Sequence, residues 1–172
     1  ETTFAVTQST ARQPARVERV SRDLFLGRRL ALPCENPETP AVEVLSAGPL
    51  LPDVEARIVD DAGAPLGERQ VGEIALRCAS LFSGYFREPE ATAGALRDGW
   101  HHSGDLGYLA DGHLFVTGRK KDVIIVAGKN LYPQDIERVV SAVPGIYPGR
   151  CVALGLDDSA VGTQRLIVLA EV

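Results

Sequence analysis

The stretch Gly99–Glu137, GWHHSGDLGYLADGHLFVTGRKKDVIIVAGKNLYPQDIE, holds most of the signals that decide the fold. Within it, Asp111-Gly112 separates two alternating apolar runs, Leu106–Leu109 and His113–Thr117. This arrangement predicts a β-hairpin, because glycine tolerates the positive φ that a tight turn requires. The stretch therefore begins in a β-rich part of the chain.

The second half of the stretch changes pattern. The apolar run Val123–Val126 predicts a buried strand, and Gly128-Lys129-Asn130 predicts a turn. Pro133 then suits the first position of a helix. Apolar residues follow at the spacing of one helical face: Ile136, Val139, Val140 and Val143. Two more strand patterns come after this helix, at Cys151–Leu156 and Leu166–Val172.

The chain before Gly99 is mostly strand-like. Strand patterns occur at Val42–Leu45, Val54–Val59 and Val71–Leu76, and Glu88–Leu96 has the start of a short helix, whereas residues 1–40 show only weak patterns. The order is mostly β up to about residue 118 and then mixes strands with a helix. The sequence thus predicts an α+β fold with a domain boundary in the region 118–122.

Composition excludes several classes of partner. The chain has 172 residues and a formal net charge of −5, which gives no general attraction for nucleic acid or anionic membranes. No run approaches the roughly 18 apolar residues of a membrane span. Three widely spaced cysteines favour a reduced, cytoplasmic setting. The absence of methionine, including at residue 1, indicates an excerpt of a longer protein.

Two short motifs are candidate ligand sites, and each has a plainer alternative. In Ser103-Gly104-Asp105, the aspartate can accept hydrogen bonds from the two vicinal hydroxyls of a ribose, but it can equally cap its own turn. In Gly118–Asp122, GRKKD, three cations can pair with phosphate, but they can equally form a solvated turn. Taken separately, both motifs favour the plainer interpretation.

The common nucleotide fingerprints are not present. A phosphate-binding loop ending at Gly128-Lys129 needs glycine where Val123 stands and serine or threonine where Asn130 stands. No G-x-G-x-x-G follows a strand, so a Rossmann site is unsupported. His101 and His102 are adjacent and would face opposite sides of a strand, which excludes joint chelation of one metal.

The order of the motifs carries more information than any one of them. The ordered set is Gly72-Glu73-Ile74, Ser83-Gly84-Tyr85, Gly99-Trp100, Ser103-Gly104-Asp105-Leu106, Gly118–Asp122 and the segment Gly128–Glu137. Together they resemble the adenylate-forming superfamily, which includes acyl-CoA synthetases, fatty acyl-AMP ligases and peptide-synthetase adenylation domains. The resemblance implies that residues 1–119 end a large N-terminal domain with a β-barrel-like subdomain, and that residues 120–172 form the hinge and the start of a small α+β lid domain.

The resemblance also implies an activity. Members activate a carboxylic acid with ATP and magnesium to an acyl-adenylate, and a thiol then displaces AMP. The sequence is most similar to fatty acyl-AMP ligases, which implies a fatty acid as substrate and the phosphopantetheine arm of an acyl carrier protein as acceptor. Coenzyme A as acceptor, in an acyl-CoA synthetase, and a non-catalytic nucleotide-binding relic are the alternatives. An acyl-carrier module is disfavoured by the strand-rich pattern.

Five residues match family positions with known roles. By this resemblance, Asp105 would hold the ribose hydroxyls and Arg119 would assist at ribose or phosphate. Lys121 matches the hinge of the lid, and Gly128 lies where the thiol-bearing arm enters. Glu1 matches the magnesium-binding glutamate, by its position relative to the later motifs. The phosphate-binding loop and the C-terminal lysine of the family have no match here, so this chain alone is expected to bind nucleotide poorly and not to complete adenylation.

Overall fold

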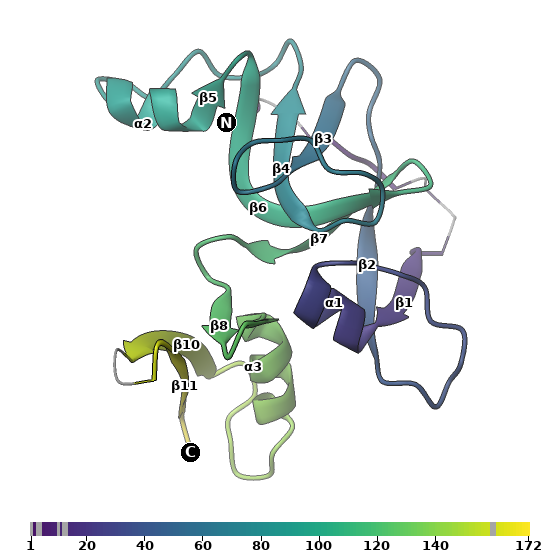
Figure 1. The fold of residues 1–172 in the computed structure, drawn as a ribbon, viewed down its shortest axis with the longest axis vertical. Helices are drawn as coiled ribbons and strands as arrows, with labels where there is room; N and C mark the ends of the chain where they lie inside the picture. The colour runs from purple at the N-terminus through teal and green to yellow at the C-terminus, as the bar shows by residue number, and fades with distance from the viewer. Residues whose placement is uncertain (1, 3–4, 10, 12–13, 159–160) are drawn as a thin grey trace. The chain divides into compact units, whose positions relative to one another are not determined.

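The chain divides into two compact units in a computed structural model (Figure 1). The first unit is Glu1–Thr117 and the second is Gly118–Val172. The structure describes residue 2, residues 5–9, residue 11, and residues 14–158 and 161–172. The division between the units falls two residues before the position 119/120 that the family resemblance implies. Each unit is built around its own strands.

The first unit is organised on one antiparallel sheet (Figure 1). Its strands are β1 (Val17–Ser21), β2 (Ala41–Pro49), β3 (Glu55–Val59), β4 (Gly72–Arg77), β5 (Leu96–Arg97), β6 (Trp100–Ala110) and β7 (His113–Arg119), the last of which runs across the boundary. The order is β1-β2-β7-β6-β4-β3, and β5 pairs with β6. The predicted α+β class is confirmed, and within the described residues β1 and β3 end the sheet without closing it into a barrel.

The β6–β7 hairpin confirms the turn predicted at Asp111-Gly112. Both residues have positive φ, 49° and 74°, as a two-residue hairpin turn requires. Tyr108 and Phe115, one from each strand, are fully buried and stack with ring centroids 4.7 Å apart. The core also contains a cluster of aliphatic side chains: Ile58, Ile74, Leu76 and Leu114. The hairpin thus supplies both the turn and part of the core.

Two helices flank this sheet, and one of them was missed from the sequence. The short helix α2 (Pro89–Ala95) confirms the prediction over Glu88–Leu96. Helix α1 (Arg22–Arg28) and strand β1 lie in the segment that showed only weak patterns. Arg29 ends α1 in a left-handed conformation, with φ of 52°. Arginines on both elements obscure the apolar pattern, although Val20 and Phe25 are buried.

A network of charged side chains joins β1 to the β6–β7 turn. Glu18 receives hydrogen bonds from Arg16 at 2.7 Å, from Arg69 at 3.0 Å and from the Tyr108 hydroxyl at 3.2 Å. Arg16 and Arg69 also pair with Asp111, at 2.6 and 3.0 Å. Burial alone would raise the pKa of Glu18, but the two arginines outweigh it and the pKa lies below its ordinary value.

The second unit contains two hairpins and a helix (Figure 1). Its elements are β8 (Ile124–Val126), β9 (Lys129–Leu131), α3 (Pro133–Ser141), β10 (Cys151–Asp158) and β11 (Thr163–Ala170). The prediction of a turn at Gly128-Lys129-Asn130 is wrong in register, because Lys129 and Asn130 belong to β9. The turn is Ala127-Gly128, and Ala127 adopts the positive φ (48°) that sequence alone does not suggest for alanine.

The predicted helix beginning at Pro133 is confirmed as α3, but much of its apolar face is exposed. Val139 is 66% exposed and Val143, just beyond the helix, is 49% exposed. Burial in this unit is concentrated instead on Ile124, Tyr132 and Ala153. Among the described residues α3 is the longest helix, with nine residues, and none of the helices has the length and apolar character of a membrane span.

Candidate functional site

Asp105 lies on a bulge in β6, in the first unit. In the pairing of β4 with β6, Glu73 is opposite Leu106 and Ala75 is opposite His102. Three residues of β6, Ser103 to Asp105, therefore face the single residue Ile74. Gly104 has a φ of 73°, which is strained for residues that carry a Cβ. Such bulges redirect a side chain out of the regular ladder and are enriched near active sites.

Hydrogen bonds fix the shape of this bulge. The Ser103 hydroxyl donates to the carbonyl of Ile74 at 2.9 Å and accepts from the backbone N–H of Asp105 at 3.0 Å. The N–H of Gly104 donates to Oε1 of Glu73 at 3.2 Å. Asp105 itself is half-buried. The aspartate is thus presented by a backbone whose polar groups are tied to β4.

His102 and Glu73 form a buried pair behind the bulge. His102 Nδ1 lies 3.7 Å from Oε2 of Glu73, an ion-pair distance beyond hydrogen-bond range. Burial lowers the pKa of His102, with Arg97 and Arg57 adding to the shift and Glu73 opposing it. Beside it, His101 is also buried, and its ring meets that of Phe82 edge-on at 5.5 Å. Both histidines are therefore buried among protein side chains, which indicates a structural role for each.

We expect the neutral state of His102 to make the first unit less stable in acid. The pKa of His102 in the folded chain lies below the ordinary 6.5, so the unfolded chain binds more protons as the pH falls below that value. The stabilisation that neutral His102 provides above pH 6.5 is then lost as the pH falls toward the lowered pKa, by at most about 1.4 kcal/mol per pH unit. Urea denaturation followed by fluorescence of Trp100, the single tryptophan, measures this slope. The variant His102→Gln should have a smaller slope between pH 7 and 5, and an unchanged slope would contradict the assignment.

Arg119 and Lys121 lie at the start of the second unit. Arg119 is the last residue of β7, and its carbonyl accepts a hydrogen bond from the N–H of Asp122 at 3.1 Å, which closes a turn. Both cationic side chains are exposed. Asp105 thus belongs to the first unit, whereas Arg119, Lys121 and Gly128 belong to the second.

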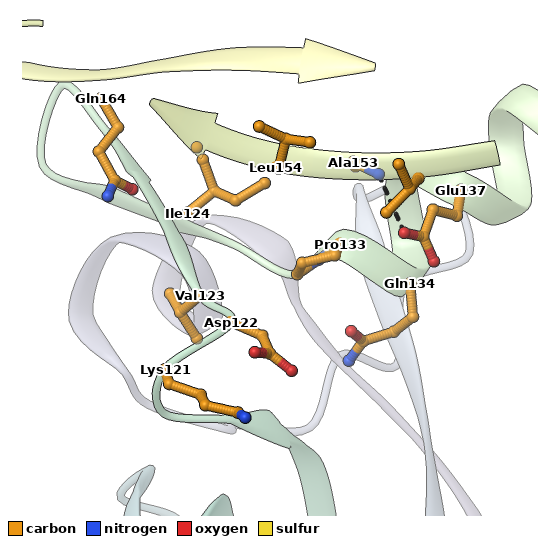
Figure 2. A pocket seen from close by; sticks show the side chains of 12 residues that line it. Lys121, Asp122, Val123, Ile124, Pro133, Gln134, Glu137, Ala153, Leu154 and Gln164 are labelled. Carbon is orange, nitrogen blue, oxygen red and sulfur yellow. Dashed lines mark hydrogen bonds between the residues drawn. The ribbon is translucent and has the colours of Figure 1, made fainter. Parts of the chain in front are cut away.

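A cavity of about 480 Å³ lies beside Lys121 (Figure 2). Figure 2 shows Lys121, Asp122 and Gln134 on one side of it and the apolar Ile124 and Leu154 on the other. Glu137 also lines the cavity, and its Oε1 accepts the N–H of Ala153 on β10 at 2.9 Å. No sequence pattern indicated this cavity, because Gln134, Glu137 and Gln164 are brought to it only by tertiary packing.

Gly128 occupies the tip of the β8–β9 hairpin. Its φ is 75°, and a Cβ built there would have no heavy atom within 4 Å. A hollow of about 780 Å³ adjoins it. The hairpin is held by β11, since the Thr163 hydroxyl accepts the N–H of Ala127 at 2.9 Å and Gln164 accepts the N–H of Ile125 at 2.7 Å. Gly128 therefore stands beside open space on a tethered turn.

The magnesium assignment to Glu1 lies outside the described residues. Within residues 14–158, 161–172 and the described part of the N-terminus, no group of three or more His, Cys, Asp or Glu side chains is placed to hold a metal ion. The assignment of Glu1 therefore stays a prediction.

Comparisons with known proteins add evidence of relationship. None of the protein-family models compared with the sequence matches it. A candidate ligase of Mycobacterium tuberculosis is 45% identical over 158 residues, which are 91% of the chain and 29% of that protein. A fatty acid–[acyl-carrier-protein] ligase of Streptomyces coeruleorubidus is 39% identical over 118 residues, 68% of the chain and 22% of that ligase. Other relatives include a candidate acyl-CoA ligase and a candidate acyl-CoA synthetase.

Solved structures give a similar result. A structure from work on fatty acyl-adenylate ligases of E. coli and L. pneumophila matches with a TM-score of 0.84 and 34% identity, over 96% of this chain and 29% of that one. Further matches include adenylation domains bound to acyl-adenylates. The chain thus spans less than a third of the length of each of these proteins.

Proposed function

Because the chain belongs to the adenylate-forming superfamily, we propose that it is part of a ligase that activates a fatty acid with ATP and passes the acyl group to the phosphopantetheine thiol of a carrier protein. The observation that carries this proposal is the likeness of almost the whole chain to a fatty acyl-adenylate ligase structure. We further propose that residues 1–119 end the large domain and that residues 120–172 begin the mobile lid, in a cytoplasmic enzyme.

The proposed reaction has two steps. A carboxylate oxygen of the acid attacks the α-phosphorus of ATP, a P–O bond forms, and the bond to pyrophosphate breaks. A thiolate then attacks the acyl carbon of the adenylate, a thioester forms, and AMP leaves with the electron pair of the broken C–O bond. Glu1 and the phosphate oxygens would hold magnesium, which would neutralise charge at the phosphates.

The residues of this chain take positioning roles in the proposal. Asp105 accepts hydrogen bonds from the ribose hydroxyls. The bulge supports this role because it takes Asp105 out of the regular strand pairing. Arg119 pairs with ribose or phosphate oxygens. Lys121 lies in the turn after β7, where a few residues can absorb the rotation of the lid between the two steps.

A specific observation favours a second acceptor. Several relatives are named as CoA ligases, so coenzyme A is the alternative to a carrier protein. Both acceptors end in the same phosphopantetheine thiol, and the chemistry of transfer is the same.

The test is pyrophosphate exchange by the full-length protein that carries this chain. We expect ATP–pyrophosphate exchange with fatty acids, followed by acyl transfer to a cognate carrier protein faster than to coenzyme A. The 172-residue chain alone should support no exchange and serves as the negative control. Absence of exchange with every carboxylate tried would overturn the proposal, and faster transfer to coenzyme A would select the second acceptor.

We expect Gly128→Leu to separate the two steps. A leucine side chain would enter the hollow beside Gly128, where the thiol arm is proposed to pass, and misplacing a reacting group by an ångström can slow its reaction severely. Acyl transfer should fall by about tenfold or more, while exchange stays within about twofold. Gly128→Asn, which tolerates the same positive φ, controls for backbone strain. Equal losses in both steps would contradict the assignment of Gly128.

A further inference from the structure

Glu73 is a buried carboxylate with an unusual position. It is 8% exposed, on a strand whose other buried residues are apolar or small, and it is paired in register with Val59 on one side and Leu106 on the other. Burying a carboxylate costs several kcal/mol unless hydrogen bonds and charges compensate it. An apolar residue would serve the core of the sheet at lower cost. The carboxylate therefore calls for a specific contact.

The contact that distinguishes Glu73 is made with the bulge. Its Oε1 accepts the N–H of Gly104 at 3.2 Å, while Oε2 faces His102. The bulge takes Gly104 out of the regular register, so Glu73 supplies from its side chain an acceptor for that N–H. The peptide plane between Ser103 and Gly104 is thereby fixed, and this plane directs the next residue, Asp105.

We propose that Glu73 is a positioning residue for nucleotide recognition, which sets the direction of Asp105 by accepting the N–H of Gly104. This inference rests on the proposed function, in which Asp105 binds the ribose hydroxyls. The Ser103 hydroxyl accepts the N–H of Asp105, and Glu73 accepts the N–H of Gly104. The preference for a nucleotide with ribose hydroxyls over one without them depends on both hydrogen bonds.

The experiment measures binding of AMP and of 2′,3′-dideoxy-AMP to the full-length protein by isothermal titration calorimetry. The ratio of the two dissociation constants reports contact with the hydroxyls and does not depend on how much protein is correctly folded. Glu73→Leu removes the acceptor at nearly constant volume, and the ratio should fall by about tenfold. The destabilising control Phe25→Leu lies on α1, which packs on β1 and β2, and it should leave the ratio unchanged.

Two conservative variants keep the test decisive if Glu73→Leu does not fold. Glu73→Gln keeps an oxygen at the same distance from Gly104 but loses the charge, and it should preserve the ratio within about threefold. Glu73→Asp keeps the charge but withdraws the oxygen, and it should lower the ratio. The reverse order would show that Glu73 serves only as a charge beside His102, and would overturn the inference.

The outcomes for the unmodified protein separate this inference from the proposed function. If that protein binds no AMP, or does not prefer AMP over its dideoxy analogue, the ribose role of Asp105 is wrong and the inference fails with it. If it shows the preference and Glu73→Leu retains it, only the role of Glu73 is wrong.

Discussion

Asp105→Asn is expected to lower kcat/KM for ATP in pyrophosphate exchange by about 100-fold. A carboxylate accepts hydrogen bonds from two vicinal hydroxyls, whereas an amide offers one neutral oxygen and an N–H₂ group that cannot accept. A hydrogen bond to a charged group contributes about 1.5–3 kcal/mol, so losing one and weakening the other accounts for a loss of this size. The bulge should be retained, because its hydrogen bonds use the backbone of Asp105.

The matched control for this variant is Asp98→Asn. Asp98 is exposed in the turn before β6 and has a φ of 50°, which asparagine also tolerates. It should leave exchange unchanged. Asp105→Asn should also erase the preference for ATP over 2′,3′-dideoxy-ATP. Exchange within about threefold of the unmodified enzyme, with the preference intact, would show that Asp105 is only a turn residue.

The parts of the fold that sequence predicts best are those fixed by local chemistry. Asp111-Gly112 could be assigned to a hairpin because few residues accept its φ values, and Pro133 with its apolar stripe could be assigned to a helix. Strand β9 was missed because Ala127 supplies one of the two positive φ values of its turn, an uncommon choice for alanine. Helix α1 and strand β1 were missed because arginines obscure their apolar pattern and because β1 and α1 are packed against β2, a pairing that local patterns do not show.

The candidate site, too, was predicted from the sequence only in part. The motif order in the sequence marked Asp105, Arg119, Lys121 and Gly128, but not how any of them is held. The bulge at Gly104 depends on the register between β4 and β6, which are separated by more than twenty residues of sequence. Glu73 belongs to the sequence motif Gly72-Glu73-Ile74, yet its contact with Gly104 follows only from that register. Long-range pairing is the information that local patterns lack.

Arg69→Met is expected to lower the free energy of unfolding of the first unit by about 3 kcal/mol. The side chains of Arg69 and Glu18 are only 19% and 10% exposed, so little solvent is available to replace the lost partner. Glu18 keeps Arg16 and the Tyr108 hydroxyl, which limits the loss to the lower part of the range for breaking a buried pair. Trp100 fluorescence in urea reports the change.

The dependence on pH identifies the cause of this loss. The pKa of Glu18 in the folded chain lies below the ordinary 4.5, so its stabilisation is present above pH 4.5 and is lost as the pH falls through the lowered pKa. The difference between Arg69→Met and the unmodified chain should therefore be largest near neutrality and shrink in acid. Arg29→Met breaks a more exposed pair, 3.4 Å from Asp61, and should cost less than about 1 kcal/mol. A loss for Arg69→Met that stays constant down to pH 3 would instead indicate lost packing of the arginine side chain.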